Sequence, residues 1–167
     1  MLLINCSNRE KNCFKILNDI KNENDKLISL SNKNMKFCLG CEACHNNLET
    51  HCALDDFITN VIYDEIINAN EIVFASPMYM SNINGILKNL LDRMNPLYQK
   101  GLLKGKKIYL IMTGGSSKED NEEEINGIIK YFEGISEWMN FDFEFLEYFD
   151  NENYENRINK VKERLNR

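Results

Sequence analysis

Proline and glycine are scarce in this chain, which has two prolines and eight glycines among its 167 residues. No internal repeat, low-complexity tract or linker divides the sequence. With 43% apolar and 28% charged residues, it has the composition of a globular protein. We therefore predict one domain over residues 1–167, large enough to bury its own core.

Basic tracts and long apolar runs are also missing. The formal net charge is -6, and the lysines between residues 100 and 107 are scattered. This balance argues against nucleic acid or an anionic membrane as the main partner. No apolar stretch reaches transmembrane length, and the opening MLLIN lacks a positively charged leader. We expect a cytoplasmic protein, in which cysteines stay reduced.

Two nucleotide-binding fingerprints are absent, because neither G-x-G-x-x-G nor G-x-x-x-x-G-K-[ST] occurs. No Ser/His/Asp or paired-carboxylate arrangement stands out either. The sequence therefore assigns no catalytic acid, base or nucleophile.

Apolar runs alternate with apolar stripes at helical spacing, a pattern typical of an α/β fold. The predicted strands are MLLIN (1–5), KLISLS (26–31), EIVFAS (71–76), KKIYLIMT (106–113) and FDFEFLEYF (141–149), the last at the sheet edge with acids on a wet face. Helical stripes fall within 13–20, 58–69, 83–94, 125–139 and 154–165. Asp55 is the expected cap of the second helix, and Pro96 the expected end of the third. Right-handed crossovers would give a doubly wound parallel sheet with helices on both faces.

Ligands of such sheets bind at the carboxyl ends of the strands. The first loop offers Ser7, Arg9 and a helix N-terminus, which suit a phosphate. The loop after the third strand, SPMYMSN, offers apolar and aromatic surface to a flat ring, unless Met78 and Met80 simply fill core. Thr113-Gly114-Gly115 lets the backbone approach that ring. A phosphate at the first helix and a ring in this crevice match the binding geometry of FMN.

Four of the six cysteines lie in CLGCEACHNNLETHC, with the spacing C-x2-C-x2-C-x7-C. Gly40 allows a tight turn between the first two. Four thiolates are the ligands that a [4Fe–4S] cluster requires. Zinc also binds four thiolates, and a thiol switch or a relic site is a third interpretation. His45 and His51 are expected to be unliganded surface residues, and Cys6 and Cys13 to be small buried thiols, although Cys6 lies on a ligand-side loop.

Several motifs together resemble the iron–sulfur flavoproteins, a branch of the flavodoxin-like NAD(P)H-dependent FMN reductases. They are the Ser/Arg turn after the first strand, C-x2-C-x2-C with a later C-x2-DD, S-P-x-Y…L-K…DR, and T-G-G. The likeness spans about residues 1 to 115. It implies a flavodoxin-like, five-stranded parallel sheet in the order 2-1-3-4-5, with the cysteine loop (38–52) inserted after strand 2.

The resemblance also implies cofactors and partners. Cys38, Cys41, Cys44 and Cys52 would hold a [4Fe–4S] cluster. FMN would contact Ser7, Arg9, Pro77, Met78, Tyr79, Met80, Ser81, Asn82, Thr113, Gly114 and Gly115. Electrons would come from a ferredoxin-type protein or NAD(P)H and pass to a small acceptor such as a quinone, a flavin or an oxygen species. The chain would form a homodimer or homotetramer.

Two other functions remain open. One is a flavin-only NAD(P)H reductase whose cysteines bind zinc or nothing. The other is a non-enzymatic metal-binding or thiol-sensing module on a flavodoxin scaffold. It is favoured by the first loop, Cys6-Ser7-Asn8-Arg9, where the family usually has G-S-P-R.

Overall fold

The computed structural model describes residues 1–46 and 52–166. Five parallel strands form its sheet in the order β2-β1-β3-β5-β6, and a short strand, β4, pairs antiparallel with β3. The strands are β1 (Leu2–Asn5), β2 (Lys26–Ser29), β3 (Glu71–Tyr79), β4 (Asn82–Ile83), β5 (Lys107–Thr113) and β6 (Asp142–Phe149).

Helices connect the strands. They are α1 (Asn12–Ile20), α2 (Ala43–Asn46), a π-helical turn η1 (Ile58–Ile62) that runs into α3 (Tyr63–Asn68), α4 (Gly85–Asp92), α5 (Asn95–Gln99), a 3₁₀ turn η2 (Glu119–Asn121), α6 (Glu122–Met139) and α7 (Tyr154–Arg164). Within the described residues, no helix is both long and apolar enough to cross a membrane.

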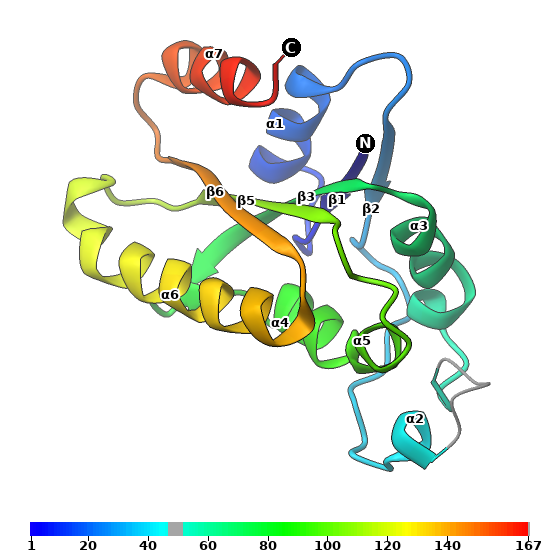
Figure 1. Ribbon diagram of the computed structural model, residues 1–167. Coiled ribbons are helices and arrows are strands. Elements are labelled where there is room, and N and C mark those ends of the chain that lie inside the picture. The colour runs from blue at the N-terminus through cyan, green and yellow to red at the C-terminus, as the bar shows by residue number, and fades with distance from the viewer. Residues whose placement is uncertain (47–51, 167) are drawn as a thin grey trace.

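The sheet lies between two helical layers (Figure 1). Helices α1 and α7 cover one face, where Leu3, Val73 and Ile111 are buried with Ile16 and Val161. Helices α3, α4 and α6 cover the other, where alternate strand residues such as Ile4 and Phe74 are buried. The period-2 alternation of side chains along each strand produces both cores. Helix α2 lies apart from both layers, at the lower end of the molecule in Figure 1.

The predicted α/β architecture with a parallel sheet is confirmed, and the five predicted strands lie in the expected order. The sixth strand, β4, was not predicted. Strand β3 also continues to Tyr79, three residues beyond the predicted end, and includes Pro77. Pro77 is tolerated because the register of β1 ends at Ala75, so only β5 needs to pair with β3 at this position.

The third predicted helix ends earlier than expected. Helix α4 stops at Asp92, and Pro96 lies in the first turn of α5. Proline is favoured at this position because the first helical N–H groups need no intrahelical partner.

Strand β6 pairs with β5 at the sheet edge, as predicted, but its acids are not all on a wet face. A register shift between Leu110 and Ile111 leaves Leu146 as an extra residue and shifts the alternation of β6. Glu147 is consequently buried, where it accepts a 2.6 Å hydrogen bond from Lys118 Nζ and lies 3.5 Å from Arg157 Nη1. The bulge thus turned one of the predicted surface carboxylates inward.

The same shift places Tyr148 against the loop after β5. A Cβ added to Gly114 would lie 1.7 Å from Tyr148 Oη, whereas a Cβ on Gly115 would meet nothing within 4 Å. The Tyr148 hydroxyl donates to the carbonyl of Ser116 at 3.2 Å. Tyr148 of β6 therefore leaves room only for glycine at position 114, whereas the side-chain space at position 115 is open.

We predict that Gly114→Ala destabilises the protein by about 1–3 kcal/mol, because the added methyl group overpacks against Tyr148. Gly115→Ala is the matched control, with an expected change within about 0.5 kcal/mol. Urea unfolding followed by circular dichroism measures both. Equal stabilities for the two variants would contradict this account of Gly114.

Candidate functional site

The first loop presents an open helix N-terminus at the carboxyl end of β1. Among the described residues, no side chain caps α1, and its first turn contains no acid. Arg9 is exposed beside it, and its positive charge lowers the pKa of Cys13 against the larger effect of burial. Free N–H groups and a nearby cation are the features that bind a phosphate. Ser7 is buried, and its hydroxyl accepts from Arg9 N at 3.2 Å, so it orders the loop.

The segment after β3 forms a tight hairpin instead of the predicted loop. Tyr79 pairs with Asn82, and the two residues between them, Met80 and Ser81, both have positive φ (50° and 59°). Such turns usually contain Gly or Asn, since other side chains are strained there. The Met80 side chain is 98% exposed, and Tyr79 is 41% exposed. Met80 therefore does not fill core, and Met78 is only partly buried.

Asn84 connects this hairpin to the first loop. Its Oδ1 accepts from Leu87 N at 2.9 Å and caps α4, while its Nδ2 donates to the carbonyl of Cys6. Asn84 was not among the predicted site residues, although an asparagine before an apolar stripe is a recognisable N-cap signal.

The loop after β5 lies at the same edge of the sheet. Thr113 is buried, and its Oγ1 lies 3.4 Å from Cys13 Sγ. Parallel register brings Thr113 beside Pro77 and Ala75 beside Asn5, so the three predicted loops meet at one edge of the sheet.

The two isolated cysteines are inert. Burial, and then the nearby Cys13, raises the pKa of Cys6 well above its usual value. Burial raises the pKa of Cys13 to about 11. A thiol with a raised pKa is a poor nucleophile at neutral pH. Both are therefore small buried thiols, as expected, and Cys6 is not a reactive thiol.

The four clustered cysteines line a single cavity of about 300 Å³. Cys38 and Cys41 are exposed, and Cys44 and Cys52 are partly buried. Gly40 has a φ of +60°, which provides the predicted turn between the first two. Opposite the cysteines, α6 contributes Tyr131, Ile135, Trp138 and Met139 to the wall. Part of the predicted loop forms α2, and residues 47–51, including His51, lie outside the described residues.

The sulfurs do not converge on one point. Among residues 1–46 and 52–166, no three His, Cys, Asp or Glu side chains are placed to hold a single metal ion. Tetrahedral zinc needs sulfurs only about 3.8 Å apart, given Zn–S bonds of about 2.3 Å. The four cysteines therefore share one cavity, while the described residues form no ligand set for a single ion.

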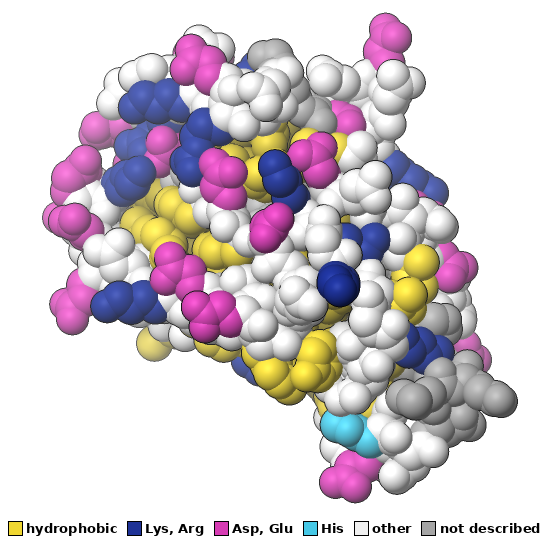
Figure 2. Space-filling view, viewed as in Figure 1, with side chains coloured by type: hydrophobic (Ala, Val, Ile, Leu, Met, Phe, Trp, Pro, Cys, Tyr) yellow, Lys and Arg dark blue, Asp and Glu magenta, His cyan; other side chains and the backbone are white. Residues whose placement is uncertain are grey.

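A second short helix, α5, contacts the cysteine segment, whose described residues are 38–46 and 52. Asn95 Nδ2 lies 3.0 Å from Cys44 Sγ and 3.0 Å from His45 Nε2, and Gln99 Nε2 lies 3.4 Å from His45 Nδ1. Trp138, which is 56% exposed, lies against Tyr98 with ring centroids 4.8 Å apart and the ring planes tilted by 44°. Figure 2 shows hydrophobic side chains beside the histidine, at the end of the molecule where α2 and α5 lie in Figure 1.

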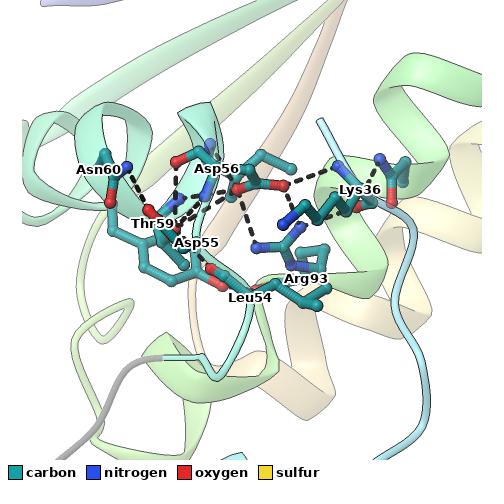
Figure 3. A network of polar contacts seen from close by, with 10 residues as sticks. Lys36, Leu54, Asp55, Asp56, Thr59, Asn60 and Arg93 are labelled. Carbon is teal, nitrogen blue, oxygen red and sulfur yellow. Dashed lines mark hydrogen bonds and ion pairs between the residues drawn. The ribbon is translucent and has the colours of Figure 1, made fainter. Parts of the chain in front are cut away.

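A buried ion pair lies where the chain before the cysteine segment meets the chain after it (Figure 3). Arg93, directly after α4, makes two hydrogen bonds to Asp56, from Nη1 at 2.7 Å and Nη2 at 3.1 Å. Nη1 also donates to the carbonyl of Lys36 at 2.7 Å, and Asp56 Oδ2 accepts from Lys36 N at 2.7 Å. The side chains of Arg93 and Asp56 are 1% and 0% exposed. The pair thus links the residues before Cys38 to those after Cys52.

Asp56 also starts the helix that follows. Its Oδ1 accepts from Ile58 N at 3.0 Å and Thr59 N at 3.3 Å, which is the bonding of an N-cap. The predicted cap, Asp55, is wrong by one residue, since its carboxylate accepts from Asn60 Nδ2 instead.

Electrostatics couple this pair to the cavity. Burial raises the pKa of Asp56, but hydrogen bonds from Arg93, Lys36 and Thr59 outweigh it and hold the pKa below the usual value. Burial lowers the pKa of Arg93, whereas Asp56 and the nearby Cys52 raise it overall. Burial, and then the charge of Cys52, raises the pKa of Tyr63, whose hydroxyl donates to the Arg93 carbonyl at 2.5 Å. Cys52 therefore lies close enough to Arg93 and Tyr63 to raise the pKa of both.

Comparison with known proteins agrees with this geometry. The family model described as NADPH-dependent FMN reductase matches residues 1–123. An iron-sulfur flavoprotein of Archaeoglobus fulgidus is 36% identical over 99 residues, which cover 56% of this chain and 47% of that protein. One of Methanocaldococcus jannaschii is 29% identical over 109 residues, covering 64% and 54%. The chain thus spans about half the length of these curated relatives.

Solved structures support the fold. A WrbA-like flavodoxin of Agrobacterium tumefaciens aligns with a TM-score of 0.65 and 8% identity, over 96% of this chain and 88% of that one. The predicted flavodoxin-like α/β architecture is confirmed by this likeness.

We predict that Arg93→Met destabilises the protein by about 3–5 kcal/mol, because it leaves the Asp56 carboxylate buried without its partner. Arg164→Met is the matched control: Arg164 pairs with Glu144 at 2.7 Å, but both side chains are 42% exposed, so its loss should cost at most about 1 kcal/mol. Chemical denaturation of both variants gives the comparison. Similar losses would mean that the buried pair does not anchor the segment.

Proposed function

The chain belongs to the NADPH-dependent FMN reductase family, and from this premise we propose that it is a flavin-dependent oxidoreductase with two redox cofactors. FMN and a [4Fe–4S] cluster would carry electrons from NAD(P)H or a ferredoxin-type protein to a small acceptor such as a quinone, a flavin or an oxygen species. The observation that carries the proposal is the single cavity lined by Cys38, Cys41, Cys44 and Cys52.

The donor set of the cavity fits a cluster. Each thiolate of a four-cysteine site binds a different iron of the cube, so the sulfurs surround the group at a wider spacing than zinc allows. The four described cysteines share one cavity, and four thiolates are the ligand number that such a cluster requires. Both curated relatives described above are named iron-sulfur flavoproteins, which supports the same choice.

The residues that would bind FMN lie toward the other end of α4. The uncapped N-terminus of α1 and Arg9 would hold the phosphate, and Ser7 would keep the loop in shape. The hairpin from Pro77 to Asn82 and the backbone at Thr113 and Gly115 would hold the ring system. Gly114 would contribute backbone only, because its side-chain space belongs to Tyr148.

The two cofactors supply the redox chemistry: the cluster exchanges single electrons, and FMN exchanges one or two. The protein would bind and orient them and set their potentials through burial and hydrogen bonds. Arg93 and Asp56 would hold the cysteine segment in place, and the apolar wall of α6 would limit access of water to the cluster. As in the sequence analysis, we assign no acid–base residue, and we propose assembly into a homodimer or homotetramer.

We predict that protein purified without oxygen contains about four irons and four sulfides per chain together with FMN. Cys44→Ser should lose most of the iron, because it removes one of four ligands. Cys6→Ala/Cys13→Ala is the matched control, since these cysteines lie outside the cavity, and it should keep its iron. Visible absorption with iron, sulfide, zinc and flavin analysis of the same samples measures this.

The alternative functions give different results. Flavin bands without iron would indicate a flavin-only reductase. A colourless protein with zinc or free thiols, unchanged by anaerobic cluster reconstitution and added FMN, would overturn the proposal in favour of a metal-binding or thiol-sensing module.

We predict that Arg9→Ala weakens FMN binding about 10- to 100-fold, the effect of losing one hydrogen bond to a charged group. Lys15→Ala is the control: Lys15 lies one turn further along α1 and pairs with Asp19 at 2.9 Å. Quenching of flavin fluorescence during titration gives both affinities. Equal affinity of the two variants would place the phosphate elsewhere.

A further inference from the structure

We propose that Asn95 is a positioning residue for the cluster: its side-chain amide donates a hydrogen bond to the sulfur of Cys44 and raises the reduction potential of the bound cluster. This inference rests on the proposed function, because it requires a cluster at the four cysteines. No sequence motif predicts a role for Asn95, and only its contact with Cys44 Sγ identifies it.

The geometry places the amide directly on the sulfur. Asn95 Nδ2 is 3.0 Å from Cys44 Sγ, and Asn95 itself lines the cavity. Asn95 begins α5, where Pro96 fixes the backbone of the first turn. Its amide is therefore held by a helix that lies outside the cysteine segment in the sequence.

An amide N–H at this position favours the reduced cluster. Reduction adds one negative charge, part of which resides on the ligand sulfurs, and a donor to sulfur stabilises this added charge. Hydrogen bonds to the sulfurs are among the factors that set iron–sulfur potentials. Removing the donor should therefore make the cluster harder to reduce.

The nearby cations are less suited to this role. Asp92 and then more distant charges, including that of Cys38, raise the pKa of Lys88, so Lys88 is within electrostatic reach of the cavity. However, Lys88 is paired with Asp92 and Arg93 with Asp56, so a carboxylate offsets each positive charge. Asn95 is neutral, and its partners are the sulfur and the imidazole of His45.

Gln99 provides a matched control on the same helix. Asn95 and Gln99 both contact the imidazole of His45, at 3.0 Å and 3.4 Å, but only Asn95 reaches a cysteine. An effect transmitted through His45 should appear in variants of either residue. An effect of the bond to sulfur should appear only in variants of Asn95.

The test is an anaerobic redox titration of the cluster, followed by electron paramagnetic resonance, in the wild-type protein and in Asn95→Leu, Asn95→Asp and Gln99→Leu. Asn95→Leu keeps the size of the side chain but removes the donor. We expect about a tenfold smaller equilibrium constant for one-electron reduction, a fall of about 59 mV. Asn95→Asp should fall further, because a carboxylate beside the sulfur repels the added electron. Gln99→Leu should match the wild type.

The outcomes separate this inference from the proposed function. If the wild-type protein binds a cluster and the Asn95 variants show the same reduction potential, the role of Asn95 is overturned and the proposed function stands. An equal fall of the reduction potential in Gln99→Leu would assign the effect to His45 and would also overturn the role of Asn95. A wild-type protein that binds no cluster overturns both. Should Asn95→Leu fail to bind iron, Asn95→Ala, which removes the donor without adding bulk, provides the potential.

Discussion

The ion pair between Arg93 and Asp56 is the interaction on which the cysteine segment depends. Moving two charges out of water costs several kcal/mol per ion, and this cost is offset only where the hydrogen bonds of both groups are satisfied. Here the bonds between the two side chains are supplemented by bonds to the main chain of Lys36, and among the described residues only the buried Nε of Arg93 is left without a partner in this pair. The pair therefore holds Lys36 and Asp56, twenty positions apart in the sequence, at one point of the core, and the four cysteines that line the cavity belong to the chain between them.

Helix α4 gives the two candidate cofactor sites a common support. At its N-terminus Asn84 binds the carbonyl of Cys6 in the first loop, and just beyond its C-terminus Arg93 binds Lys36. Eight residues at 1.5 Å each make the helix about 12 Å long. The buried stripe of α4, which includes Leu87, Leu90 and Leu91, fixes both ends to the sheet at once. The proposed flavin site and the cysteine cavity thus lie toward opposite ends of one helix.

Local patterns were enough to predict most of the fold but not the contacts that build the site. The alternation of strands and the apolar stripes depend on residues close in sequence, and these elements formed at nearly the predicted positions. The Asp56–Arg93 pair joins residues 37 positions apart, and the Asn95–Cys44 bond residues 51 apart. A charged residue in a polar stretch looks the same whether its partner is water or a distant side chain. Tertiary pairing of this kind leaves no periodic signal.

The errors have equally local causes. Asp55 and Asp56 are adjacent carboxylates, and either can cap a helix; burial against Arg93 selected the second. Gly114 was predicted to let the backbone approach a ring, which stays a prediction; the structure adds that a bulge in β6 places Tyr148 in its side-chain space. The SPMYMSN segment contains no glycine to mark its two-residue turn, because Met80 and Ser81 adopt positive φ despite their side chains. Each left-handed residue costs about 1–2 kcal/mol, which the pairing of Tyr79 with Asn82 and the capped start of α4 must offset.

Charge distribution gives a further reason why the site is built in this way. The chain carries a net charge of -6, and the phosphate of FMN is anionic. Long-range attraction therefore does not favour the phosphate, whose binding would depend on local donors, the N–H groups of α1 with Arg9. The cluster would be held by the four thiolates, and Asn95 would act on one of their sulfurs. Because a neutral amide attracts a sulfur only at contact distance, the position of α5 relative to the cysteine segment determines its effect. Helix α2 has no buried residue, whereas α5 buries Pro96 and Leu97, so the core fixes the helix that carries the donor.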